Sequence, residues 1–181
     1  MFIDEKYAAP IREWVLNREN REQFLHDPDM KGVQSVCGLP HSQNEDRLRV
    51  KAKFPYVEMF RVWQQILSYY GLPKTQELDG EFGALISYSE AGHKVQPHQD
   101  PNPPRKTHTR FNVLVSKSEK GGEAIIDGSI VPTEVNEVWV CAAGKFTHSS
   151  VTTEGETPRI LLSYGTYLKD KELTNVLNIN K

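Results

Sequence analysis

The second half of the chain is a series of short apolar segments separated by residues that favour turns. Each segment has the length of a strand, and the series begins after the turn-forming pair Asp79-Gly80. The segments are 83–89, 110–116, 123–130, 137–142 and 159–168. Many short strands with turn signals between them are typical of an antiparallel sandwich or barrel. The pattern therefore predicts a β core over about residues 81–170.

The first half, about residues 1–80, has the periodicity of helices instead. From about Pro10 to His26, apolar residues recur among charged ones at helical spacing, which predicts an amphipathic helix. Aromatic and aliphatic residues at the same spacing predict a second helix from Val57 to Tyr70. Residues 30–50 show no clean period and are expected to form a loop.

Composition is consistent with one domain. A chain of 181 residues is long enough for one sizeable core, and its 38% hydrophobic and 25% charged residues are ordinary proportions. The net charge of -2 gives no electrostatic basis for binding nucleic acid or an anionic membrane. We therefore expect a single α+β domain over 1–181, with a mainly β core that the N-terminal helices cover.

Several features favour a cytoplasmic protein. No segment approaches the roughly 20 apolar residues of a membrane span, and the charged start of the chain has no apolar run of signal-peptide length. The two cysteines, Cys37 and Cys141, lack metal-ligand spacing. Free thiols in a reducing compartment are favoured over a disulfide between them.

The segment Gln96-Pro-His98-Gln-Asp100-Pro carries the strongest chemical signal. In an extended chain, His98 and Asp100 project to the same face. His148 follows the run at 137–142 and reaches them if the sheet curls into a barrel. Two imidazoles and one carboxylate leave half of an octahedron open, as in non-haem iron(II) oxygenases. Because His-x-Asp also occurs often by chance, the alternative is three unrelated surface residues.

An arginine leads the strongly apolar run at 159–168. Arg159 and Ser163 share a face by the period of two. A buried arginine needs an anionic partner, and its planar fork binds a carboxylate at two points. Arg159 follows His148 by eleven residues, so it is suited to hold a dicarboxylate whose other end chelates the metal. The alternative is an ordinary ion pair with Glu154 or Glu156.

Four other polar residues lie near these motifs in the sequence. We expect Arg110 and Lys145 to be solvated charges at strand ends, rather than groups that meet an acidic substrate. His93 and His108 flank the metal motif, and we expect both to be surface histidines in loops rather than ligands.

Together, the order and spacing of these motifs resemble the 2-oxoglutarate- and Fe(II)-dependent oxygenases, and within them the prolyl 4-hydroxylase-like group. The resemblance runs from about Phe82 to Leu168. It is carried by Tyr88-x3-Gly92-x5-His98-x-Asp100, then Gly121-Gly122-Glu123, then His148 and Arg159. Ala124 departs from the threonine that often follows the Gly-Gly-Glu sequence, and many prolyl hydroxylases have lysine where Arg159 stands.

The resemblance implies a double-stranded β-helix (jelly roll) with helices packed on its major sheet. It implies Fe(II) as cofactor, 2-oxoglutarate and O2 as co-substrates, and a catalytic centre in which three residues ligate the metal. The implied metal ligands are His98, Asp100 and His148. The implied contacts to 2-oxoglutarate are Arg159 at the distal carboxylate, together with Tyr88, Ser163 and Asn112.

The predicted activity is hydroxylation of an unactivated C–H bond, in a prolyl or other residue of a peptide or protein. Two alternatives remain: the same chemistry on a small molecule such as a free amino acid, and a non-catalytic, cupin-like metal-binding module. Arg159 argues against the module, because a simple metal binder needs no anchor for a dicarboxylate. Residues 1–80 match no motif and are where we expect substrate contacts.

Overall fold

The computed structural model describes residues 1–21, 25–26, 34–39, 54–80 and 83–179. Its elements in chain order are α1 (Glu5–Leu16), α2 (Arg18–Arg21), β1 (Leu25–His26), β2 (Gln34–Leu39), α3 (Tyr56–Tyr69), β3 (Ala84–Ser89), β4 (Thr107–Ser116), β5 (Ala124–Ile126), β6 (Ser129–Val131), β7 (Val138–Cys141), β8 (His148–Ser150), β9 (Arg159–Leu168) and α4 (Asp170–Ile179).

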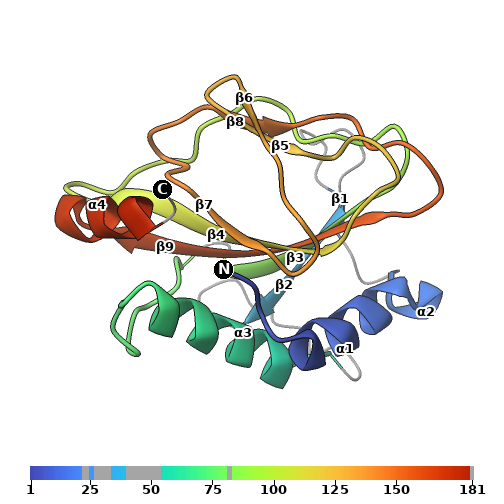
Figure 1. Ribbon diagram of the computed structural model, residues 1–181, viewed down its shortest axis with the longest axis horizontal. Helices are drawn as coiled ribbons and strands as arrows, with labels where there is room; N and C mark the ends of the chain where they lie inside the picture. The colour runs from blue at the N-terminus through green and yellow to red at the C-terminus, as the bar shows by residue number, and fades with distance from the viewer. Residues whose placement is uncertain (22–24, 27–33, 40–53, 81–82, 180–181) are drawn as a thin grey trace.

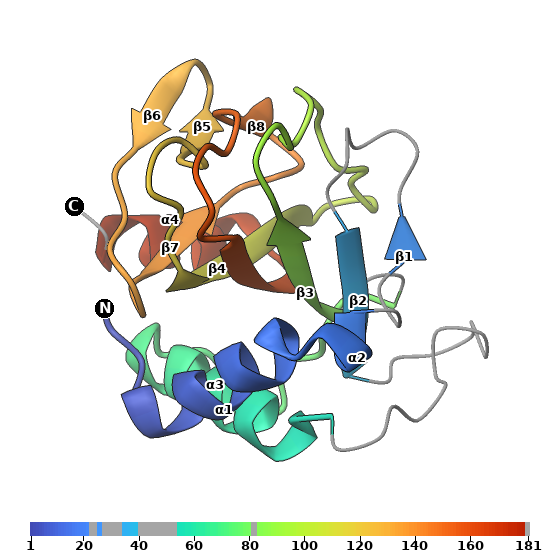
Figure 2. The same ribbon diagram turned by 90° about the vertical axis from the view of Figure 1, so that its right-hand side faces the viewer.

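The elements form three layers, with helices, a large sheet and a small sheet stacked in that order (Figures 1 and 2). The large sheet has the strand order β1-β2-β3-β9-β4-β7, and the small sheet has the order β6-β5-β8. All pairings between these strands are antiparallel. This architecture confirms the expected double-stranded β-helix with N-terminal helices on its larger sheet.

The predicted helix from Pro10 to His26 is instead α1 followed by the short α2, and its last two residues form β1. The helix α1 starts before Pro10, so that proline lies inside it and removes one backbone hydrogen bond. The earlier start follows from burial, because Ala8 already belongs to the buried stripe that continues with Ile11 and Val15.

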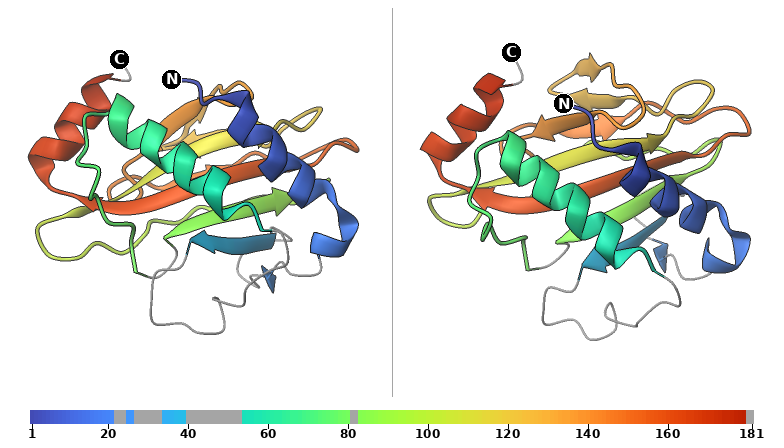
Figure 3. Two further views of the ribbon diagram at one scale, coloured as in Figure 1. Left: turned by 90° about the horizontal axis from the view of Figure 1, so that it is seen from below. Right: turned by 60° about the horizontal axis from the view of Figure 1, so that its bottom comes forward.

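The helix α3 confirms the prediction for Val57 to Tyr70, and with α1 it covers one face of the large sheet (Figure 3). Trp63 of α3 stacks on Tyr164 of β9, with ring centroids 5.4 Å apart. The Tyr164 hydroxyl donates a hydrogen bond to the Met59 carbonyl at 2.8 Å. Aromatic packing and a buried hydrogen bond therefore join the helix to the middle of the sheet.

Trp63→Ala is expected to lower the free energy of unfolding by about 3–5 kcal/mol, because it leaves a cavity between helix and sheet. The Trp63 side chain is only 4% exposed. Phe60→Ala on the same helix is the control, since Phe60 is 48% exposed and should change stability by at most about 0.5 kcal/mol. Urea denaturation measures both, and equal losses would contradict this packing.

Alternation along β9 assigns its side chains to two faces. Because Tyr164 packs against α3, Ile160 and Leu162 also face the helices. Arg159 and Ser163 therefore face the small sheet and the space between the sheets. The neighbouring strands follow the same rule, because residues directly paired across an antiparallel ladder point to the same side.

The predicted loop at 30–50 is wrong over the residues of β2, which pair antiparallel with β3. The sequence of β2, QSVCGL, has no alternation of polar and apolar residues. Its pairing with a neighbouring strand makes it a strand, and that pairing is invisible to a local period. Residues 30–33 and 40–50 of the predicted loop lie outside the described part.

The predicted strand at 123–130 is a hairpin of β5 and β6. Asp127 and Gly128 form its two-residue turn, with φ of 49° and 78°, as a type I′ turn requires. The strand β9 has the bounds predicted for it, whereas α4 was not anticipated and buries Leu173 and Val176. Within the described ranges, no helix combines the length and apolar character needed to cross a bilayer.

Candidate metal centre

Backbone pairing brings the two histidines of the predicted metal site together. His98 and His148 form an antiparallel bridge, with N–H to carbonyl distances of 3.1 and 2.9 Å in the two directions. Their ring centroids lie 4.1 Å apart. Asp100 is held by its own N–H, which donates to the Ala143 carbonyl at 3.0 Å, just beyond β7. Segments some fifty residues apart in sequence thus hold the cluster.

The donor atoms of this cluster fit a metal ion. One ligand atom from each of the three residues lies within 4.8 Å of the other two. Asp100 Oδ1 is 3.5 Å from His98 Nε2 and 3.9 Å from His148 Nε2. The Nδ1 atoms of the two rings lie 2.8 Å from the Gln96 carbonyl and 3.3 Å from the Phe146 carbonyl. With Nδ1–H donating, both Nε2 lone pairs are free to bind an ion.

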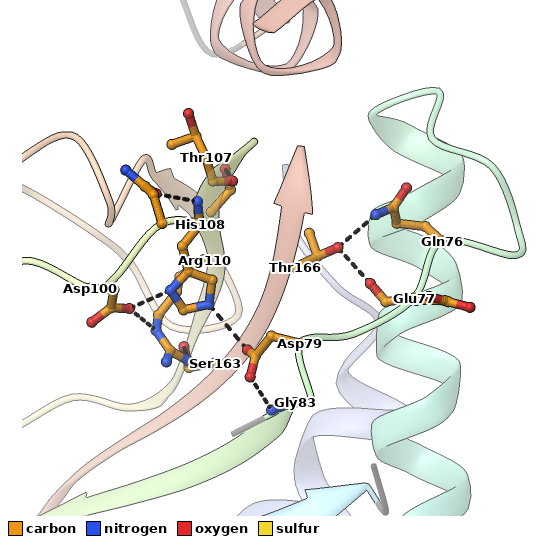
Figure 4. A network of polar contacts seen from close by, with 12 residues as sticks. Gln76, Glu77, Asp79, Gly83, Asp100, Thr107, His108, Arg110, Ser163 and Thr166 are labelled. Atoms are coloured by element: carbon orange, nitrogen blue, oxygen red, sulfur yellow. Dashed lines mark hydrogen bonds and ion pairs between the residues drawn. The ribbon is translucent and has the colours of Figure 1, made fainter. Parts of the chain in front are cut away.

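The second oxygen of Asp100 has partners of its own. Oδ2 accepts a hydrogen bond from Arg110 Nε at 2.8 Å and lies 2.8 Å from His108 Nδ1 (Figure 4). Burial would by itself raise the pKa of Asp100, but His108 and Arg110 are among the groups that outweigh burial and hold this pKa well below its usual range. The carboxyl group is therefore ionised at neutral pH, as a metal ligand must be.

The placements of Arg110 and His108 correct two expectations. The side chain of Arg110 is only 12% exposed, so it is no solvated strand-end charge, and it donates to Ser163 Oγ at 3.4 Å. His108 is 3% exposed and lies within β4 rather than in a loop. The strand starts at Thr107, earlier than its apolar run indicated, because its polar first residues are buried by the surrounding structure.

The other two flanking residues lie where the sequence suggested. Lys145 is about half exposed and its Nζ lies 3.5 Å from Asp170 Oδ1. His93 lies outside the strands, with its Nδ1 accepting the N–H of Glu90 at 3.2 Å. Neither belongs to the metal-ligand cluster found among the described residues.

Arg159 is buried on the interior wall, with 5% of its surface exposed. Burial lowers its pKa to about 10, an effect that the charge of Glu123 opposes. Among the residues that the structure describes, none forms a hydrogen bond or ion pair with its guanidinium, so neither Glu154 nor Glu156 neutralises it. An unpaired buried charge is costly, and a site of this kind is suited to an anionic ligand.

The Gly-Gly-Glu sequence passes close to this arginine. Gly122 has φ of +80°, and a Cβ atom there would lie 2.7 Å from Arg159 Cδ. A larger residue at this position would therefore be strained in its backbone and would also crowd the arginine. This close approach gives a physical reason for glycine at this point of the motif.

The other three predicted co-substrate residues divide between the two faces of the large sheet. Asn112 and Ser163 are direct partners across β4 and β9, so both face the interior beside Arg110. Tyr88 is paired with Ile160 and therefore faces the helices. The predicted contact of Tyr88 with the co-substrate is thus corrected, since its hydroxyl donates to Glu90 Oε1 at 2.7 Å instead.

Cys141 is a free, buried thiol that is paired in register with Arg110. Burial, with a further contribution from the Asp100 charge, raises its pKa to about 12. It therefore remains a neutral thiol and is a poor metal ligand. The side chain of Cys37 lies outside the described part of the chain.

No family model matches this sequence, and no curated protein matches it significantly. Solved structures share its fold. A prolyl-4-hydroxylase from Pseudomonas putida superposes with a TM-score of 0.61 at 13% identity, covering 93% of this chain and 89% of its own. A Trichoplax adhaerens prolyl hydroxylase, in complex with a hypoxia inducible factor peptide fragment, gives 0.59 at 11% identity, with 96% and 83% covered.

A third structure is SnoN, a non-heme α-ketoglutarate-dependent epimerase from nogalamycin biosynthesis. It gives a TM-score of 0.63 at 15% identity, covering 92% of this chain and 74% of its own. At such identities the likeness establishes the fold alone. The chain therefore shares a double-stranded β-helix with these two prolyl hydroxylases and this epimerase.

Proposed function

We propose that this chain is a 2-oxoglutarate- and Fe(II)-dependent dioxygenase that hydroxylates an unactivated C–H bond. One observation carries the proposal: the three-residue ligand cluster and a buried arginine face the same interior, and among the described residues no hydrogen bond or ion pair engages that arginine, on which only the charge of Glu123 acts from a distance. Metal binding alone accounts for the cluster only. A dicarboxylate that binds the metal at one end and an arginine at the other accounts for both.

His98 and His148 would hold Fe(II) through Nε2, and Asp100 would hold it through Oδ1. A facial set of this kind leaves the opposite side of the ion open to co-substrates. With 2-oxoglutarate bound, iron would supply the oxidising chemistry, so that one atom of O2 would be inserted into the C–H bond and the other would enter succinate, with release of CO2. Arg110 would hold the other carboxylate oxygen, and with His108 it keeps the pKa of Asp100 low, so that the ligand stays ionised.

The interior wall would bind 2-oxoglutarate. The Arg159 guanidinium offers two parallel N–H donors to the distal carboxylate. Ser163 lies four residues further along β9, roughly 13 Å at the rise of an extended strand. Ser163 and its partner Asn112 offer a hydroxyl and an amide between Arg159 and the metal ligands.

For the substrate, we propose a prolyl or other residue of a peptide or protein. The shared fold with two prolyl hydroxylases, one in complex with a peptide fragment, supports this choice. The ligand cluster also opens toward solvent, since the His98 side chain is 30% exposed. A small molecule is the second candidate, because SnoN from nogalamycin biosynthesis has an equally similar fold.

The test is succinate formation from 2-oxoglutarate by the purified chain supplied with Fe(II) and air. We expect turnover that requires Fe(II), 2-oxoglutarate and O2 together, and that rises in the presence of the true substrate. Proline-containing peptides and free amino acids, screened for a gain of one oxygen atom, separate the two substrate classes. Iron binding without succinate across both panels would instead favour the non-catalytic, cupin-like module.

A further inference from the structure

A row of buried polar groups lies behind the metal-ligand cluster. His108 Nε2 is 3.1 Å from Asp79 Oδ2, and His108 Nδ1 is 2.8 Å from Asp100 Oδ2 (Figure 4). Asp79 is 1% exposed and His108 is 3% exposed, so both have been taken out of water. Each of the three residues comes from a different segment, and the imidazole links the two carboxylates.

The far end of this row is firmly anchored. Asp79 Oδ1 accepts the N–H of Gly83 at 3.1 Å, and the Asp79 N–H donates to the Gly165 carbonyl at 2.8 Å. A buried carboxylate is costly unless such partners satisfy it. Asp79 is therefore fixed in both backbone and side chain, and it presents Oδ2 to His108 in one place.

Gly165, in the middle of β9, makes room for this contact. A Cβ atom at Gly165 would lie 1.9 Å from Asp79 Oδ2 and 2.9 Å from His108 Nε2. Glycine in a strand interior weakens the strand, and its presence often marks a close approach by another group. Here the approaching groups are the carboxylate and imidazole of the row.

We propose that Asp79 and His108 are positioning residues for the metal centre. This inference rests on the proposed function, because it assumes that Asp100 ligates the metal. Asp79 orients the His108 ring, and His108 holds Oδ2 of Asp100, so that Oδ1 alone is presented to the imidazoles of the cluster.

The consequence concerns how many positions of the metal the carboxylate occupies. A carboxylate can bind an ion through one oxygen or through both. With Oδ2 hydrogen-bonded by Arg110 Nε and in close contact with His108 Nδ1, Asp100 has one oxygen left for the metal. One-oxygen binding leaves three positions of an octahedron for co-substrates, as the proposed reaction needs.

The experiment titrates the metal-free chain with Co(II), an air-stable probe for the Fe(II) site, and follows the visible absorption of bound cobalt. His108→Phe removes the link, Asp79→Ala removes its anchor, and Gly165→Ala displaces both without changing any charge. We expect each to weaken Co(II) binding about 10- to 100-fold, as loss of a group that orients a ligand does. Asp79→Asn keeps a polar contact to the ring, so its loss should be smaller.

Thr166→Val is the matched control, because it breaks a polar contact on the next residue of the same strand. Thr166 Oγ1 accepts from Gln76 Nε2 at 2.6 Å and donates to the Glu77 carbonyl (Figure 4). We expect it to lower thermal stability and leave Co(II) affinity unchanged. Thermal unfolding of every metal-free variant separates an effect on the site from an effect on the fold.

Three results would overturn the inference. The first is a Co(II) affinity equal to that of the wild type in folded Asp79→Ala and Gly165→Ala. These two variants test the inference even if His108→Phe does not fold. The second is an equal loss in Thr166→Val, because affinity would then follow general stability. The third is a wild-type chain that binds no Co(II). That result would overturn the proposed metal centre as well, whereas the first two results overturn only the positioning role.

Discussion

His148→Ala is expected to reduce succinate formation from 2-oxoglutarate to the level of the metal-free protein. Removing this imidazole leaves one histidine and one carboxylate, which do not complete a facial set of three. An average substitution costs the fold about 1 kcal/mol, so a loss of turnover in a variant that stays folded reports on the metal site. Succinate release and the iron content of the purified protein are the two measurements.

His93→Ala is the control for that result. His93 lies on the same segment as His98 but outside the cluster, so its removal should leave turnover and iron content unchanged. Turnover retained in His148→Ala, or lost equally in His93→Ala, would contradict the assignment of the metal ligands.

Arg159→Met is expected to weaken 2-oxoglutarate binding by about 3 kcal/mol, or roughly a hundredfold, while leaving metal affinity unchanged. The substitution keeps an apolar stem of similar length and removes the donors proposed to hold the distal carboxylate, and charged hydrogen bonds of this kind are worth about 1.5–3 kcal/mol each. Anaerobic titration of the Fe(II)-loaded protein with 2-oxoglutarate measures the loss. Arg159→Lys keeps the charge without the planar fork, so its affinity for 2-oxoglutarate should fall between those of the wild type and Arg159→Met.

For Arg159→Met we expect no matching loss of stability. Because Arg159 is buried and forms no hydrogen bond or ion pair among the described residues, its replacement should leave the ligand-free protein equally stable or more stable. Lys6→Ala, at an exposed position on α1 that pairs with Asp4, is the control and should not change 2-oxoglutarate affinity. Wild-type affinity in Arg159→Met would argue for a binding module without a dicarboxylate anchor.

Some elements could be predicted because a local pattern and burial coincide in them. The strand β9 is apolar throughout and has the bounds expected of it, and α3 buries the aromatic stripe that its spacing indicated. The pairing of His98 with Asp100 likewise follows from a separation of two residues in extended chain. Each of these inferences needs only neighbours in sequence.

Other features depend on a partner strand that the sequence does not identify. β2 has no alternation of its own and is a strand because β3 pairs with it. Tyr88 and Asn112 both lie in predicted strands, yet register places Asn112 in the interior and Tyr88 against the helices. A period of two shows which residues of a strand share a face, but only the packed layers decide which face is inward.

By itself, the sequence determined the β-rich second half, its covering helices and a candidate trio of metal ligands, because alternation and helical spacing are local. Tertiary structure alone decided that β8 meets the His98 segment, and that Arg159 is buried without a hydrogen bond or ion pair in the described chain. It also decided that His108 lies between two carboxylates. These depend on contacts between segments far apart along the chain, which form only when the two sheets close over a common interior.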